Sequence, residues 1–233
     1  MPNLNPSSAF GLLIAATLVA CNLKTPPIKP VCDPLDATNQ ATLPDMVDGG
    51  YPETINIVDQ DDDHGTSYSW ADGQGYVLAP IKDVWDALQQ GGVVADRREL
   101  SAESTTMSGV DPKADWSFIL DCTTASSTGL SGPYSVEWRG SHTAGTSSDP
   151  TDAIVCGDLN KSLQLAGSDL MSTLSDSIVL TEISANVTQY SAIRHRGPLQ
   201  DSGANCKQYV QDVYDNVLST VHNNPDLMTP LGH

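Results

Sequence analysis

The sequence predicts an α+β domain in which an antiparallel sheet is wrapped around a long C-terminal helix. Short apolar segments separated by Ser-, Thr- and Gly-rich stretches recur through the second half of the chain, a pattern typical of antiparallel strands. After them, residues 205–223 carry apolar side chains at helical spacing. A helix of about five turns must bury its apolar face, and the inner face of the sheet is available to cover it.

The first elements of the domain are a strand and two short helices. Gly75–Ala79 is a short apolar strand, and Pro80 then suits the first turn of a helix, where its missing N–H has no cost. One helical face is formed by Ile81, Val84, Trp85 and Leu88. Gly91 and Gly92 end this helix, and a second short helix is expected over Val93–Arg98.

Five segments are predicted strands: Trp116–Cys122, Tyr134–Trp138, Thr151–Cys156, Ile178–Ile183 and Val187–His195. The last two form a hairpin, in whose connection Asn186 tolerates positive φ. Residues 101–115 and 139–152 are expected to be long polar loops, and residues 161–174 fit either a strand or a helix.

The long helix is predicted over Asn205–Asn223. Its apolar face consists of Tyr209, Val210, Val213, Tyr214, Val217, Leu218 and Val221. Asn224 and Pro225 end it. The opposite face is polar, so the helix lies with one side in the core and one side in water.

Composition and charge exclude two classes of function. The chain has 233 residues, enough for one large domain or two small ones. Acidic residues outnumber basic ones 29 to 11, which gives a formal charge of −18. Such a chain is repelled by phosphate backbones, so nucleic-acid binding is not expected. No apolar run approaches the roughly 20 residues of a spanning helix, so the chain is not expected to cross a membrane.

The N-terminus is predicted to be a signal peptide over residues 1–20. Phe10–Ala20 has the length of the apolar region of such a peptide, although residues 1–8 contain no Lys or Arg; the alternative is a buried helix. Residues 18–21 (LVAC) resemble the lipobox of bacterial lipoproteins. That resemblance implies lipidation of Cys21 and a location in the bacterial cell envelope, at the outer membrane or a periplasmic face. The lipid anchor is then the one expected contact with a membrane.

The remaining boundaries follow from composition. Residues 21–67 are expected to be a lipidated, Pro-rich tether that includes an acidic loop, because five prolines lie between residues 22 and 45. Residues 68–224 are expected to form the domain, and residues 225–233 a C-terminal tail.

Four cysteines remain when Cys21 is set aside. In an exported chain an even number indicates two disulfides, here with three connectivities. Cys122 with Cys156 is favoured because both lie on predicted strands, and this leaves Cys32 for Cys206. Free thiols are the alternative, whereas a zinc site is disfavoured because no two cysteines have C-x-x-C spacing.

The order of these elements resembles the helix-grip fold of the START-like superfamily, which includes polyketide cyclases and the Bet v 1 allergens. Residues 75–92 (GYVLAPIKDVWDALQQGG), 178–197 (IVLTEISANVTQYSAIRHRG) and 208–221 (QYVQDVYDNVLSTV) carry the likeness, which covers residues 68–223. The resemblance implies a cavity between sheet and helix that binds a lipid, sterol, polyketide or other hydrophobic small molecule.

Ten residues are candidates for the wall of that cavity: Trp85, Trp116, Tyr134, Trp138, Tyr190, His195, Tyr209, Val213, Tyr214 and Val217. They fill the core instead if no cavity is open. Alternation places Arg194 and Arg196 on one strand face and His195 on the other. A His195 that faced the cavity with Glu137 or Glu182 would be an acid–base dyad. The two arginines are expected to be solvated by default, or else paired with acids.

The acids Asp59, Asp61 and Asp63 alternate as in a calcium loop, but the spacing of the glycine and Trp70 at position 12 depart from that motif. A solvated acidic loop is favoured over a metal site, and no cofactor is expected. Binding of a hydrophobic small molecule is therefore the leading function. The alternatives are a structural or adhesion module with a filled core, and a cyclase- or hydrolase-like enzyme; no catalytic residue is assigned.

Overall fold

A computed structural model describes residues 39–61, 68–106, 111–124, 133–159, 173–197 and 203–232. The strands are β1 (Ile55–Gln60), β2 (Ser69–Val77), β3 (Leu100–Thr106), β4 (Trp116–Thr124), β5 (Pro133–Thr146), β6 (Asp149–Leu159), β7 (Thr173–Ser184) and β8 (Val187–Gly197). The helices are α1 (Ile81–Ala87), α2 (Gly91–Val94) and α3 (Gly203–Val221), with 3₁₀ turns η1 (Arg97–Glu99) and η3 (Pro225–Leu227). None of the described helices is long and apolar enough to span a bilayer.

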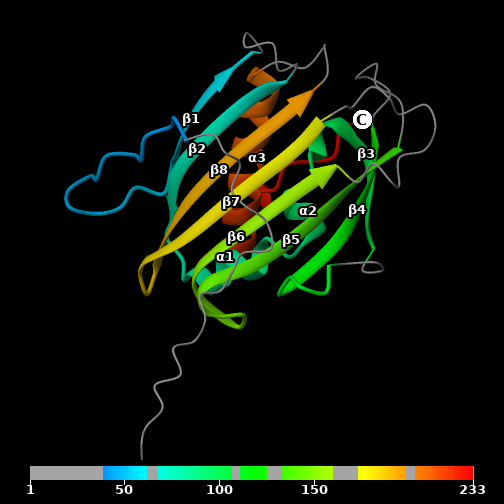
Figure 1. Ribbon diagram of the computed structural model, residues 1–233. Coiled ribbons are helices and arrows are strands. Elements are labelled where there is room, and N and C mark those ends of the chain that lie inside the picture. The colour runs from blue at the N-terminus through cyan, green and yellow to red at the C-terminus, as the bar shows by residue number, and fades with distance from the viewer. Residues whose placement is uncertain are drawn as a thin grey trace, which may run out of the picture.

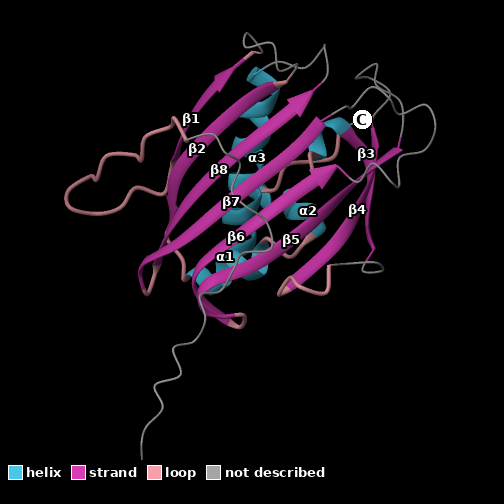
Figure 2. Cartoon of the chain, viewed as in Figure 1, coloured by secondary structure: helices cyan, strands magenta, loops and turns pink. Residues whose placement is uncertain are grey.

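The eight strands form one antiparallel sheet in the order β1-β2-β8-β7-β6-β5-β4-β3. From β2 the chain passes through α1, α2 and η1 to the far edge of the sheet, and then returns strand by strand until β8 pairs with β2. The helices lie on one face of the sheet, with α3 crossing behind β2, β8 and β7 (Figures 1 and 2). This is the predicted helix-grip arrangement of an α+β domain.

Helix α3 packs most closely on the first strands of the sheet. It contacts β1 and β2 along its length, and α1 and α2 lie against it as well. Val213 and Val217 on α3 are almost completely buried. At the crossing, a Cβ added at Gly73 would lie 2.7 Å from Val210 Cγ1, so glycine is needed there for the helix to approach the strand. The predicted amphipathic helix is confirmed, and Asn223 at φ 51° follows its end.

Several polar segments expected to be loops are strands. β3 occupies part of residues 101–115, and β5 and β6 extend through most of residues 139–152. β3 is an edge strand exposed on most of its length, so it shows no apolar alternation. In the β7–β8 hairpin, which was predicted, Asn186 does not use positive φ; among the described non-glycine residues only Asp48 and Asn223 do.

The second short helix also differs from its prediction over Val93–Arg98. The structure has α2 at Gly91–Val94 and η1 at Arg97–Glu99, with a break between them. At Asp96 the backbone leaves helical geometry, with φ −78° and ψ 68°. The break turns the Asp96 carboxylate toward Arg194 and Arg196, so a charge contact with β8 interrupts the local helix.

Both ends of the described chain pack on the domain. In the stretch expected to be a tether, β1 joins the sheet, and Gln40 N donates to the buried Asp72 carboxylate at 2.8 Å. In the expected tail, Thr229 N donates to Asn216 Oδ1 at 2.8 Å, and Arg97 Nε donates to Thr229 O at 2.6 Å. The ends are therefore held by specific hydrogen bonds to the sheet and to α3.

The two favoured disulfide pairings are wrong. Cys122 and Cys206 are buried and take part in no disulfide. Cys122 faces the core, whereas Cys156 alternates with the core residue Val155 and faces the other side of the sheet. Side chains on opposite faces cannot be bridged without moving the backbone. No disulfide joins two of the three cysteines that the structure describes, and Cys21 and Cys32 lie outside the described residues.

We expect Leu180→Ala to lower the free energy of unfolding by about 2–5 kcal/mol, because Leu180 on β7 is 0% exposed and its loss leaves a void. Leu78→Ala is the matched control, because Leu78 is 42% exposed and its change should cost far less. Urea denaturation of both variants measures the difference. Equal destabilisation would contradict the packing described for the sheet.

Candidate functional site

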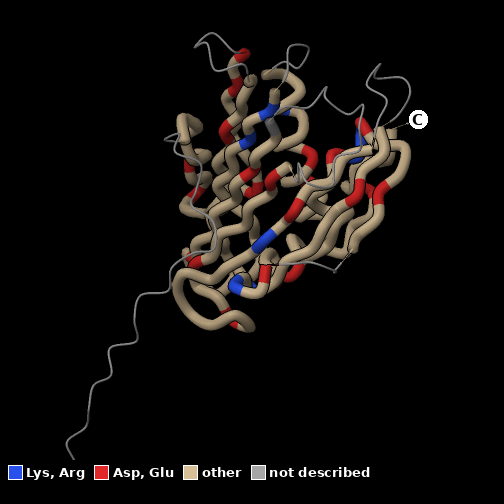
Figure 3. Tube along the Cα trace, turned by 45° about the vertical axis from the view of Figure 1, so that its right-hand side comes forward, with Lys and Arg blue, Asp and Glu red and all other residues tan. Residues whose placement is uncertain are grey.

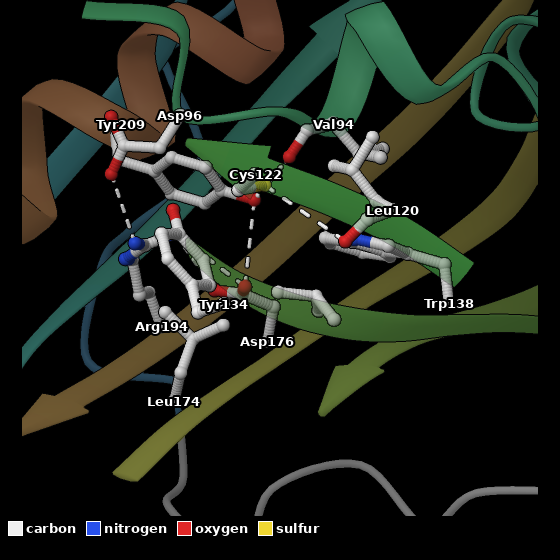
Figure 4. Close-up of a pocket in the computed structure, with 11 residues that line it drawn as sticks. Val94, Asp96, Leu120, Cys122, Tyr134, Trp138, Leu174, Asp176, Arg194 and Tyr209 are labelled. Atoms are coloured by element: carbon white, nitrogen blue, oxygen red, sulfur yellow. Dashed lines mark hydrogen bonds and ion pairs between the residues drawn. The ribbon is translucent and has the colours of Figure 1, made fainter. Parts of the chain in front are cut away.

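The candidate site is a small cavity between α3 and the inner face of the sheet. Its wall is formed by side chains of β4, β5, β7, β8 and α3, by Val94 at the end of α2 and by Asp96 after it (Figure 4). The cavity volume is about 10 Å³, which is about the space that one water molecule needs. The walls are apolar on the β4–β5 side and charged on the β7–β8 side.

Strand β8 carries the two positively charged residues of this site. Tyr190, Ala192, Arg194 and Arg196 alternate along its inner face, and the two arginines are only 2% and 3% exposed. The expectation that they are solvated by default is wrong; the alternative, pairing with acids, is what the structure has. His195 lies on the outer face, half-buried, with its ring stacked on Tyr68 at 4.6 Å between centroids.

Three carboxylates meet the two guanidinium groups. Arg194 Nη2 lies 3.0 Å from Asp96 Oδ2, and its Nη1 lies 3.5 Å from Asp176. Arg196 contacts Asp96 at 3.3 Å and Glu99 at 2.5 Å. Removing charges from water is costly unless they are paired and hydrogen-bonded, so each member of this cluster depends on the others.

Tyr209 joins the charged cluster to α3. Its hydroxyl donates to Val94 O at 2.9 Å and lies 3.4 Å from Asp176 Oδ2. The Arg194 guanidinium carbon stands 3.4 Å from the centre of the Tyr209 ring, a cation–π contact. Tyr209 therefore connects helix, sheet and the segment after α2 at one point.

The segment that carries Asp96 is fastened to α3 from both sides. Arg98 donates to both oxygens of Asp212, at 2.6 and 2.9 Å. Before the break, Val93 O accepts from Asn216 Nδ2 at 3.2 Å. These bonds set the position of Asp96, and hence the geometry of its contacts with the two arginines.

Burial changes the acid–base behaviour of the site. Desolvation raises the pKa of Asp176 to about 6, against the opposing effect of Arg194. Burial also favours the neutral form of Arg194, but Asp176 and Asp96 outweigh it and hold the Arg194 pKa above its usual value. Desolvation raises the pKa of the Cys122 thiol to about 12. The charge of Asp176 is therefore expected to change near pH 6.

The structure brings together three of the ten predicted wall residues: Tyr134, Trp138 and Tyr209 line the cavity. The others lie outside it: Trp85, Tyr190, Val213, Tyr214 and Val217 are buried in the core, Trp116 packs against Trp85, and His195 lies on the outer face. Sequence reasoning missed Asp96, Asp176 and the inward arginines. Alternation in β7 (Leu174, Asp176, Ile178, Leu180) is the signal that could have placed Asp176 inside.

The proposed acid–base dyad is not assembled at the cavity. Glu137 alternates with the inward residues Val136 and Trp138, so it faces outward as His195 does, and Glu182 is exposed near the β7–β8 turn. No described carboxylate, histidine or cysteine cluster could hold a metal ion.

The acidic loop has a structural role at the positions that the structure describes. Asp61 Oδ1 accepts from Gly203 N at 2.6 Å, at the start of α3. Asp59 lies 3.3 Å from Lys207. Asp63 lies outside the described residues.

Comparison with known proteins gives a likeness in structure only. No protein-family model matches the chain, and no curated protein matches its sequence. Human STARD10 matches with a TM-score of 0.53 at 4% identity, over 74% of this chain and 71% of that chain. Human StAR-related lipid transfer protein 5 matches with a TM-score of 0.51 at 11% identity, over 74% and 84%. At such identities the likeness is one of fold.

We expect the stability of this chain to depend on the protonation of Asp176. Its pKa in the folded chain, about 6, exceeds the ordinary value of 3.8, so the folded state binds this proton more tightly. The resulting stabilisation is present below about pH 4 and is lost as pH rises through 6. From pH 7 to pH 5 the wild type should gain about 1 kcal/mol in unfolding free energy relative to Asp176→Asn.

Urea denaturation at the two pH values measures this gain. Asp226→Asn, which changes an exposed carboxylate in η3, controls for the loss of one charge. An Asp176→Asn variant with the same pH dependence as the wild type would contradict the assignment.

Proposed function

We propose that this START-like helix-grip domain binds a hydrophobic small molecule between its sheet and α3. The observation that carries the proposal is the charged cluster buried at a cavity whose other walls are apolar. A core built only for stability is often as stable, or more so, with apolar residues in place of buried ion pairs. Titratable groups shifted by burial also gather at functional sites. The name of one protein of like fold, a lipid transfer protein, supports the same function.

The two kinds of wall suit an amphipathic molecule. Leu120, Val136 and Trp138 offer apolar surface on β4 and β5, and the Arg194 cluster offers a polar end. Because the volume is about 10 Å³, a molecule larger than water enters only when wall side chains move apart. Binding is therefore expected to be coupled to an opening of the space between α3 and the sheet.

A second candidate is a structural or adhesion module with a filled core. The small cavity volume favours it, because the closed state leaves no room for a ligand. It differs from the first candidate in one respect that can be measured, namely whether the cavity widens around an apolar molecule.

We also propose that the domain is anchored to a bacterial envelope membrane through lipid on Cys21. The support is the apolar run that ends in LVAC at residues 18–21, together with the predicted signal peptide. Acidic positions outnumber basic ones along the described trace (Figure 3), and the whole chain carries −18. An anionic membrane surface repels such a domain, which suits display on a tether rather than adsorption to lipid.

Native mass spectrometry of the full chain tests the binding proposal. We expect a co-purified apolar mass that is lost on denaturation, and we expect Val136→Phe to reduce it severalfold because the larger ring occupies the cavity at a cost of about 1–3 kcal/mol. Val179→Phe, on the outer face of β7, is the control and should retain the mass. An empty wild type that also binds no hydrophobic dye would favour the filled-core module.

Expression in a bacterium with labelled palmitate tests the anchor. We expect label and membrane association in the wild type, and neither in Cys21→Ser, because the thioether can form only on the cysteine thiol. Cys32→Ser should leave both unchanged. Label that persists in Cys21→Ser would contradict the lipobox interpretation.

A further inference from the structure

Two hydrogen-bond donors in the cavity wall have no partner among the described residues. They are Trp138 Nε1 and Arg194 Nε, on side chains that are 1% and 2% exposed. Both residues line the cavity, and Figure 4 shows them on opposite sides of it. A buried donor without an acceptor is destabilising, so a ligand atom that accepts a hydrogen bond from either one removes that cost on binding.

The described wall has no buried side-chain acceptor that lacks a donor. Its side-chain oxygens belong to Asp96, Asp176, Tyr134 and Tyr209, and none of them is among the buried unpartnered atoms. Asp96 Oδ2 accepts from both arginines, and Asp176 contacts Arg194 and Tyr209. A ligand group that can only donate, such as an ammonium, would find these oxygens already engaged.

The charge of the site distinguishes between the remaining acceptors. Two guanidinium groups already face three carboxylates, those of Asp96, Glu99 and Asp176. A ligand carboxylate would add a further negative charge in a medium of low dielectric constant, where like charges repel strongly. A neutral carbonyl oxygen accepts a hydrogen bond without that penalty.

We infer that the ligand presents an uncharged acceptor, a carbonyl oxygen, to the indole N–H of Trp138. This inference rests on the proposed function and names the chemical class of the molecule bound. The direction of the donor is set in advance, because the Trp138 ring packs closely on β6: a Cβ at Gly157 would lie 2.7 Å from the ring. The acceptor is selected by a fixed group and not by a side chain that turns to meet it.

Five naphthalene compounds with closely matched skeletons test the inference by calorimetric titration of the full chain. The ketone 2-acetylnaphthalene should bind about tenfold more tightly than 2-ethylnaphthalene, which lacks the oxygen. The corresponding alcohol should fall between them. 2-Naphthoate and 1-(2-naphthyl)ethylamine should bind more weakly than the ketone, because one adds negative charge and the other offers an ammonium donor.

Trp138→Phe should abolish the preference for the ketone, so that the ketone and 2-ethylnaphthalene bind this variant with affinities within about twofold of each other. Trp116→Phe is the matched control: Trp116 Nε1 is also buried without a partner, but Trp116 does not line the cavity. This variant should keep the preference. Urea midpoints of both variants establish that each is folded.

The outcomes separate this inference from the function on which it rests. If the hydrocarbon binds as tightly as the ketone, hydrophobic binding stands and the carbonyl class is overturned. If Trp138→Phe keeps the preference for the ketone, the assignment of the acceptor to the Trp138 indole is overturned. If no compound binds and native mass spectrometry finds no co-purified mass, both are overturned.

Discussion

The contact of Arg194 with Asp96, Asp176 and Tyr209 is the interaction on which the arrangement of the domain depends. It joins β8, β7, α3 and the segment after α2 at one buried point. A charge in that position is stable only when its partners are paired and hydrogen-bonded with it, because removal of one partner leaves the others unpaired in the core. The break between α2 and η1 follows from this requirement.

The same cluster explains why the cavity is where it is. Apolar side chains of different elements can interdigitate freely and fill space, whereas guanidinium and carboxylate groups must keep hydrogen-bond distances and directions. Packing beside the cluster is therefore expected to be less complete than packing between apolar side chains. The space left is about 10 Å³, bordered by donors that lack acceptors.

The elements with strong local patterns could be predicted from the sequence. The spacing from Tyr209 to Val221 indicates α3, and alternation indicates the β7–β8 hairpin. β3 could not be found in this way, because an edge strand exposed on both faces needs no apolar residues. The residues of the cavity wall were hard to predict for a related reason. Spacing along the sequence indicates which side chains face the core, but not which side chains from different elements lie next to one another.

The sequence by itself determined the helix-grip order of elements, the amphipathic α3 and the acidic character of the chain, because each depends on neighbours along the chain or on composition alone. Only the tertiary structure decided that Arg194 and Arg196 are buried, that His195 faces outward, and that Cys122 and Cys206 form no disulfide. These outcomes depend on pairs of residues that β8, β7, η1 and α3 bring together across about 100 positions of sequence. A charged side chain on a strand can be buried only if oppositely charged partners lie beside it in the folded domain. Those partners come from distant segments, so they take their places only when the sheet packs on the helix.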